Sequence, residues 1–349
     1  MNKKKRIQFI LVLLVFVIAC FVFLSVMFKG DSSNGDSSLI TIVKVSNQEK
    51  ISLGKELAMT NALHKKALET GKSLNEGIKS YQQEEIGVDQ FQTLLVKANK
   101  QLTFYYLLAL QNGDYSEKLK DVREDVDYDL YLMRRGSEEA AKYVTDNSTL
   151  RLEVGSDLLT QALKNENVQE AALKTEFARY EINPEFVVVD PTVWDKEEQF
   201  LKSQPDLVNF ADLSSKQKNS HEYYVKHVND SFMLIAWEIQ KMYLAKGDYL
   251  NDEINSEQLN SILDGSGYVI FSNIEEMQSL KQPKGLQAMY EDTNATLTLY
   301  KDAVLEIQKF RMDKNVKHFD TAKLILNQAD AASGRIGEFV QTVRTQYGF

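Results

Sequence analysis

The chain has 349 residues, with 41 Lys and Arg against 50 Asp and Glu and a formal net charge of −9. Four of the basic residues, Lys3 to Arg6, stand at the N-terminus, so the rest of the chain is more acidic still. This sign of charge argues against nucleic acid or an anionic membrane surface as the main partner. The only cysteine is Cys20, so the later residues have no disulfide and must be stabilised by burial alone.

Residues 7–28 form a long apolar run without a charged side chain. As a helix this run would measure about 33 Å, which matches a hydrocarbon core of about 30 Å. Basic residues crowd the preceding tail, 1–6, whereas only Lys29 follows the run closely, and this asymmetry favours a cytoplasmic N-terminus. The sequence therefore predicts a single-pass transmembrane anchor in the cell membrane, with the lipid bilayer as its partner and the C-terminal domain outside the cell.

Two alternatives to an uncleaved anchor stay open. The stretch Val17–Cys20, VIAC, resembles the lipobox of bacterial lipoproteins, in which such a cysteine becomes the lipidated first residue. The apolar run continues to Phe28, however, where those proteins usually become polar. A cleaved secretory signal would have a shorter apolar core and a small-residue exit, and no such exit occurs between Cys20 and Asp31. We therefore prefer the anchor to a lipoprotein attached through Cys20.

Residues 29–45 read as a flexible tether with a short extended segment at its end, because small polar residues give way to the β-branched run Leu39–Val45. The sequence Ser46–Glu49 is a capping box, so we expect a helix from there to about Gln83. It opens a first helical half, residues 46–183.

The first half should contain several further helices. Apolar residues from Leu95 to Ala109 recur at steps of three and four, with Asp89 placed to cap the helix and Gly113 to end it. The same period continues from Val122 to Met133, and shorter helices are expected near 149–164 and 166–181.

Two stretches read as irregular. Ile182–Trp194 has consecutive apolar residues between prolines and should be extended, so residues 184–205 are taken as a connection. Leu263–Phe271 reads as a glycine-rich turn followed by a short strand or edge contact.

The second helical half, residues 206–349, ends in the clearest pattern of the chain. A helix is expected over 286–312, then a turn at Asp313–Asn315, then a stripe from Phe319 to Val343 that keeps a helical period throughout. Such long stripes predict shallow, coiled-coil-like packing. The predicted fold class is mainly all-α: a transmembrane helix followed by an extracytoplasmic antiparallel helical bundle.

The two halves resemble each other in places. Leu110–Tyr115 (LQNGDY) matches Leu244–Tyr249 (LAKGDY), an offset of 134 positions, whereas the segment from Glu124 matches the segment from Glu291 at an offset of 167. A shared helical period can create such matches, so a true duplication is left open.

The sequence contains little that indicates an enzymatic reaction. The four histidines are not paired on one helix face, and no nucleophile elbow, phosphate loop or dinucleotide fingerprint occurs, so we expect no catalytic residue, metal site or cofactor. The acidic run Asp121–Asp129 reads as a solvated helix face.

Adjacent tyrosines at Tyr105, Tyr106, Tyr223 and Tyr224 cannot all point into one core, so they are candidate partner-binding residues. The sequence favours a non-catalytic interaction or scaffold module of the cell envelope, whose partner is another membrane or envelope protein. The alternative is a ligand-binding or sensory ectodomain that works with a membrane partner and has a pocket near Pro184–Trp194.

Overall fold

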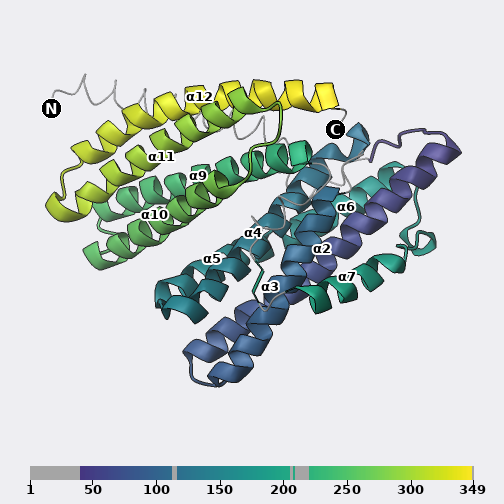
Figure 1. Cartoon of the computed structure of the whole chain (residues 1–349), viewed down its shortest axis with the longest axis horizontal. Helices are drawn as coiled ribbons and strands as arrows, with labels where there is room; N and C mark the ends of the chain where they lie inside the picture. The colour runs from purple at the N-terminus through teal and green to yellow at the C-terminus, as the bar shows by residue number, and fades with distance from the viewer. Residues whose placement is uncertain (1–39, 112–115, 205–206, 209–219, 348–349) are drawn as a thin grey trace. The chain divides into compact units, whose positions relative to one another are not determined.

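In a computed structural model the fold is described for residues 40–111, 116–204, 207–208 and 220–347 (Figure 1). These residues are mainly α-helical, and no strand occurs among them. No helix within these ranges combines the length and the apolar character that a membrane crossing requires. The predicted anchor at 7–28, with its basic tail and most of the tether, lies outside the described residues.

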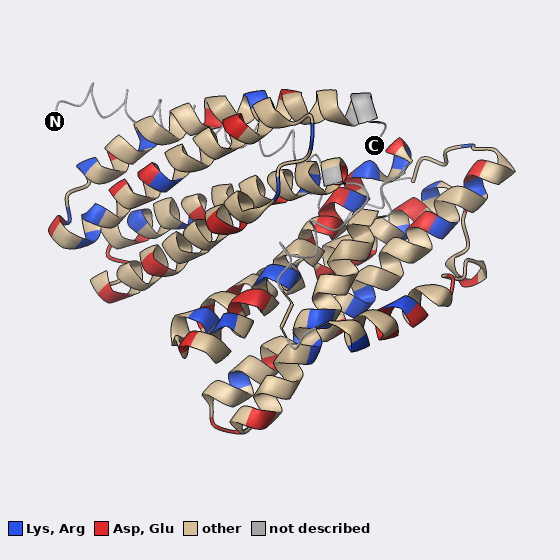
Figure 2. Ribbon diagram, viewed as in Figure 1, with Lys and Arg blue, Asp and Glu red and all other residues tan. Residues whose placement is uncertain are grey.

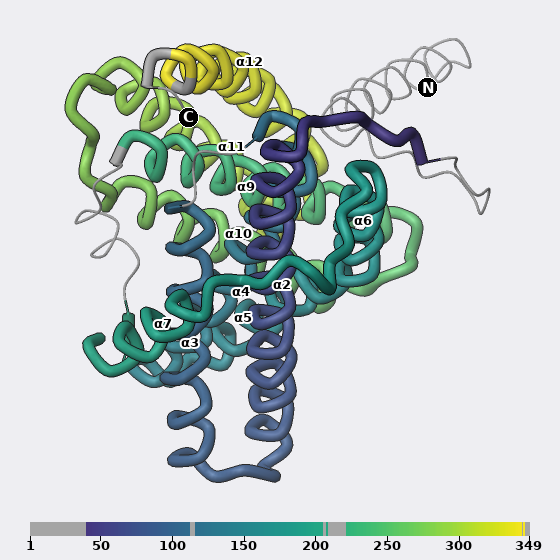
Figure 3. The backbone as a smooth tube through the Cα atoms, turned by 90° about the vertical axis from the view of Figure 1, so that its right-hand side faces the viewer, coloured from purple at the N-terminus to yellow at the C-terminus, as the bar shows by residue number. Residues whose placement is uncertain are grey.

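The chain divides into two compact units, Met1–Thr41 and Ile42–Phe349, and the description below concerns the second. Its first helices are α2 (Asn47–Gln82) and α3 (Val88–Gln111), which run antiparallel as a hairpin (Figure 3). The Ser46 side chain accepts a hydrogen bond from the amide of Glu49 at 3.2 Å, which confirms the predicted helix start. Ile42–Val45 is extended rather than a strand, with one backbone bond from Val43 to Arg179.

The first helical group is completed by α4 (Lys120–Asp146) and α5 (Thr149–Lys164). These two helices cross closely, because Gly136 and Gly155 face each other. The short helix α6 (Glu166–Arg179) packs on α2. Helices α2, α3, α5 and α6 agree with the sequence-based expectation within a few residues, although Asp89 lies in the first turn of α3 rather than at its cap. Helix α4 continues to Asp146, well beyond Met133, where the predicted stripe ends.

The connection at 184–205 is more ordered than predicted. It begins with a single 3-10 turn, η2 (Pro184–Phe186), and a short extended stretch, and then forms helix α7 (Thr192–Ser203), which packs on α3 (Figure 3). Pro191 is the N-cap of α7, so this proline precedes a helix instead of interrupting one.

The second helical group contains α9 (Ser220–Leu250), α10 (Ser256–Ser279), α11 (Gln287–Asp313) and α12 (Lys317–Tyr347), joined by short turns. The predicted turn and strand at Leu263–Phe271 is wrong, because this stretch lies inside α10. Asn255 forms a complete capping box with Gln258. Gly267 is explained by tertiary packing, because a side chain at this position would meet Gln308 of α11.

Two pairs of helices in the two groups correspond in length and spacing. Helices α4 and α11 each have 27 residues, and both their starts and their ends are 167 positions apart. Each ends at a residue in the left-handed region, Asn147 with φ 54° and Lys314 with φ 55°. Helices α3 and α10 each have 24 residues and are 168 positions apart. The structural order therefore pairs α3 with α10, so the sequence match at an offset of 134, which pairs α3 with α9, does not fit it.

The apolar core has two parts. One cluster of buried side chains is built from α2 to α7 with a few residues of α9 and α10, and the other belongs to α9 to α12. Acidic and basic residues are interspersed over the helices (Figure 2). Between the two clusters lies a set of buried charged residues.

Candidate functional site at the polar interface of the two helical groups

A pair of arginines on α4 is the centre of this polar interface. Arg134 and Arg135 are at most 1% exposed, although arginine is rarely buried unless it is paired. Both bind Glu276 of α10: Arg134 Nη2 lies 2.8 Å from Oε1, and Arg135 contacts Oε2. Burial alone would raise the pKa of Glu276, but the two guanidinium groups hold it well below its usual value. The carboxylate is therefore ionised and links the two helical groups.

The next turn of α4 extends the polar interface. Glu139 accepts hydrogen bonds from the hydroxyl groups of Tyr268 at 2.5 Å and Ser272 at 2.6 Å, both on α10. Burial would raise the pKa of Glu139, but Arg135 and Lys142 lower it. One face of α10, formed by Tyr268, Ser272 and Glu276, therefore covers α4.

A second part of the polar interface joins α3 to α9. The Tyr106 hydroxyl lies 2.9 Å from Oδ2 of Asp230 and 3.4 Å from Nδ1 of His227. His227 Nε2 lies 2.7 Å from Glu276, which connects both parts of the interface. Burial lowers the pKa of His227 and raises the pKa of Asp230 to about 7. Asp127 on α4 raises the pKa of Asp230 further, because two carboxylates repel each other.

The four predicted tyrosines are all buried, with exposed fractions of 0 to 3%. Tyr106 and Tyr223 lie where α3 meets α9, and the Tyr223 hydroxyl donates to the carbonyl of Leu107 at 3.2 Å. Tyr105 points to α7 and donates to Glu197 at 2.7 Å, whereas Tyr224 belongs to the core of the second group. The structure therefore brings two of the four to an interface, which is internal, and their binding of an external partner stays a prediction.

The acidic run Asp121–Asp129 is only partly the solvated face that the sequence predicts. Asp121 and Glu124 are exposed, but Asp129 is buried and accepts a hydrogen bond from Asn165 at 2.8 Å. Its Oδ2 also lies 3.5 Å from Nε2 of His64. Tertiary packing therefore buries the carboxylate of Asp129, which the sequence pattern places on a solvated face.

Within the described ranges, no three His, Cys, Asp or Glu side chains gather in a way that could hold a metal ion. Two grooves on the described helices are lined by residues of α5, α10, α11 and α12. Neither includes Pro184–Trp194, the segment predicted to line a ligand pocket. Val187, in that segment, and Ile182, just before it, lie against Gly54 of α2.

Sequence reasoning missed the residues that form the polar interface. Arg134, Arg135, Glu138 and Glu139 stand in the order RRGSEE, where each Arg is four residues before a Glu. This spacing is typical of ion pairs on a solvated helix face. The sequence on either side of these charges did hold a signal for their burial. Apolar residues precede and follow them, and no separate apolar stripe is left that could form the core in their place.

Comparison with known proteins gives no match: no family model, no curated protein and no solved structure is similar to this chain.

Proposed function

We infer that this chain is a non-catalytic interaction module, held at the outer face of the cell membrane by a single N-terminal span. The proposal is supported mainly by one observation: the ionisable side chains at the polar interface are buried and paired with one another. Glu139, Glu276 and Arg135 are nearly inaccessible, and each is bound to side chains of the other helical group. A general acid or base must reach a substrate proton, so these groups support a structural role rather than a catalytic one.

The arrangement also supports a rigid helical body. Packed helices present long surfaces of fixed shape, and such surfaces suit the binding of another protein. The proposed partner is a membrane or envelope protein, because the predicted N-terminal span would hold the helical body next to the membrane.

Two measurements on full-length protein in its native membrane test the proposal. The first replaces Cys20 by Ser and exposed Lys174 by Cys, and then applies a membrane-impermeant maleimide to intact cells. We expect labelling without lysis; labelling that appears only after lysis would contradict the proposed topology. The second is chemical crosslinking in intact cells with lysine-reactive reagents. Recovery of one or two specific membrane or envelope proteins is expected, and recovery of the chain alone would contradict the interaction module.

A further inference from the structure

The two helical groups repeat the same set of ion pairs. In the first group, Glu139 binds Lys142 at 2.8 Å and Arg151 at 3.1 Å, and Arg151 binds Asp146 at 2.8 Å. The residues 167 positions later form the same three pairs: Glu306 with Lys309 at 2.6 Å, Glu306 with His318 at 2.7 Å and His318 with Asp313 at 3.0 Å. Together with the matching helix bounds, these pairs indicate that α4–α5 and α11–α12 are equivalent parts of an internal repeat.

The equivalent faces differ in what covers them. On α4, the face that contains Arg135, Glu138 and Glu139 is buried, because α10 covers it through Tyr268 and Ser272. The matching residues on α11 are Asp302, Leu305 and Glu306. Asp302 and Leu305 are exposed and Glu306 is partly exposed.

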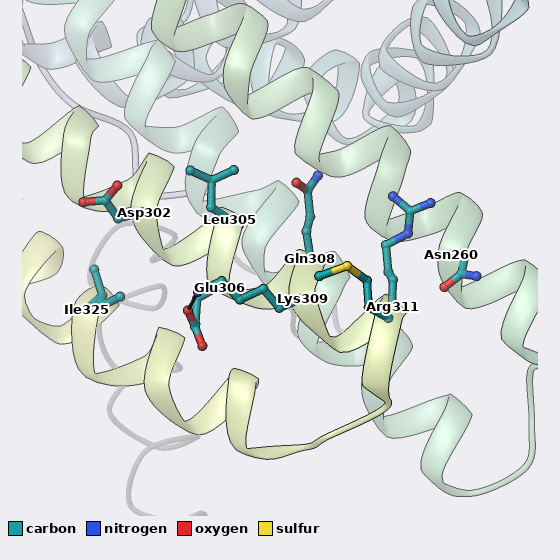
Figure 4. A pocket seen from close by; sticks show the side chains of 9 residues that line it. Asn260, Asp302, Leu305, Glu306, Gln308, Lys309, Arg311 and Ile325 are labelled. Carbon is teal, nitrogen blue, oxygen red and sulfur yellow. Dashed lines mark hydrogen bonds and ion pairs between the residues drawn. The ribbon is translucent and has the colours of Figure 1, made fainter.

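Among the described residues no helix covers this face, and a groove lies on it. It has a volume of about 910 Å³ and is lined by Asp302, Leu305, Glu306, Lys309 and Met312 of α11 together with neighbouring residues of α10 and α12. Figure 4 shows Asp302, Leu305, Glu306 and Lys309 along α11, with Ile325 contributed by α12. Leu305 is 43% and Met312 82% exposed, so the groove combines apolar side chains with charged ones.

We propose that this groove on α11 is the docking surface for an amphipathic helix of a partner protein, which packs there as α10 packs on α4. The proposal rests on the proposed function and names the surface that performs it. The chain itself supplies the precedent, because an equivalent face in the same molecule is covered by a helix.

The side chains of the groove define the chemistry of the docked helix. Hydroxyl groups one turn apart would donate to Glu306, as Tyr268 and Ser272 donate to Glu139. An apolar side chain would cover Leu305, which replaces the charged Glu138 of the first group. Asp302 occupies the position on α11 that Arg135 occupies on α4. The residue of the docked helix that corresponds to Glu276 should therefore be neutral or basic.

The test is site-specific photocrosslinking of full-length protein in its native membrane. A photoreactive phenylalanine analogue is placed at 305 or at 312, and a matched control carries it at Leu324, which is 66% exposed on α12 but does not line the groove. We expect the same partner from 305 and 312, captured at least tenfold more than from 324, with the crosslink mapped to one helix of that partner. Leu305→Glu should reduce capture from 312 at least tenfold, whereas Leu324→Glu should leave it unchanged.

Three results would overturn the docking surface: equal capture from 324, capture from 312 that Leu305→Glu does not change, or capture of a second copy of this chain. Circular dichroism of Leu305→Glu separates a lost contact from a lost fold. If lysine crosslinking recovers a specific partner but positions 305 and 312 do not, the docking surface is wrong and the interaction module stands. If neither recovers a partner, both fail.

Discussion

Glu276 is the residue on which the polar interface depends most. It binds both buried arginines of α4 and lies 2.7 Å from His227, so its charge compensates positive charge that has no access to water. Removing one partner of a buried ion pair leaves the other uncompensated, and the cost exceeds what an exposed pair contributes.

We therefore expect Glu276→Gln to lower the free energy of unfolding by about 3 kcal/mol. The measurement is urea denaturation of the full-length protein in detergent, followed by circular dichroism. Glu198→Gln is the matched control, because Glu198 pairs with Lys202 on the exposed surface of α7. That control should unfold at the same urea concentration as the unmodified protein, and equal losses in both variants would show that Glu276 has no special role.

Asp230 gives the polar interface a pH dependence. Burial raises its pKa from 3.8 to about 7, so the folded state binds a proton that the unfolded state releases. This carboxyl therefore favours folding most strongly below about pH 4, and that contribution is lost as the pH rises to about 7.

Asp230→Asn removes the titration of this group. Relative to the unmodified protein, its free energy of unfolding should increase between pH 4 and pH 7 by up to a few kcal/mol. Denaturation curves at several pH values measure the difference between the two proteins, in which other titrating groups cancel. A difference that is constant with pH would contradict the assignment.

At the scale of the element, the crossing of α4 and α5 depends on the absence of two side chains. A Cβ atom on Gly136 would lie 2.8 Å from the carbonyl oxygen of Gly155, and the reverse distance is the same. The equivalent positions of the second group, Ala303 and Ala322, are also small and buried.

Gly136→Ala should therefore destabilise the protein by about 1 to 3 kcal/mol, because the helices must move apart. Gly334→Ala is the matched control on α12, where a Cβ atom would meet nothing within 4 Å. That change should stabilise the helix by about 0.5 to 1 kcal/mol. Thermal unfolding of both variants gives the comparison, and a Gly136→Ala protein as stable as the unmodified one would show that the crossing is looser than described.

The helices were largely predictable from sequence, and the reason is local. Ser46 and the apolar stripes of α3, α4 and α12 specify helix starts and faces without reference to the rest of the chain. The stretch Leu263–Phe271 is helical despite its glycines, because Gly267 allows close packing against α11, whereas Gly265 has no neighbour within 4 Å. Helix α7 does not follow from the sequence pattern, because a proline can precede a helix as well as break one.

The candidate site was much less predictable. The burial of a charged residue on a helix can be recognised only when the helix that packs over it is known, and α10 is far from α4 in the sequence. The tyrosine pairs pointed toward the contact of α3 with α9. The Arg-to-Glu spacing around Arg134 and Arg135 is that of a solvated helix face, and only the apolar residues on either side of it pointed to burial. The long-range contacts, rather than local preferences, create this interface.

At the scale of the whole molecule, two helical groups with separate apolar clusters meet across charged residues. Such an interface fixes orientation more than it adds stability, because the desolvation of the charges offsets much of their attraction. The groups should therefore differ in stability and unfold as separate units.

Hydrogen exchange with mass spectrometry in increasing urea tests this central claim most directly on the full-length protein. We predict that peptides of α3, α4 and α5 lose protection at one urea concentration and peptides of α10, α11 and α12 at another. Loss of protection in all of these helices at a single urea concentration would contradict the account.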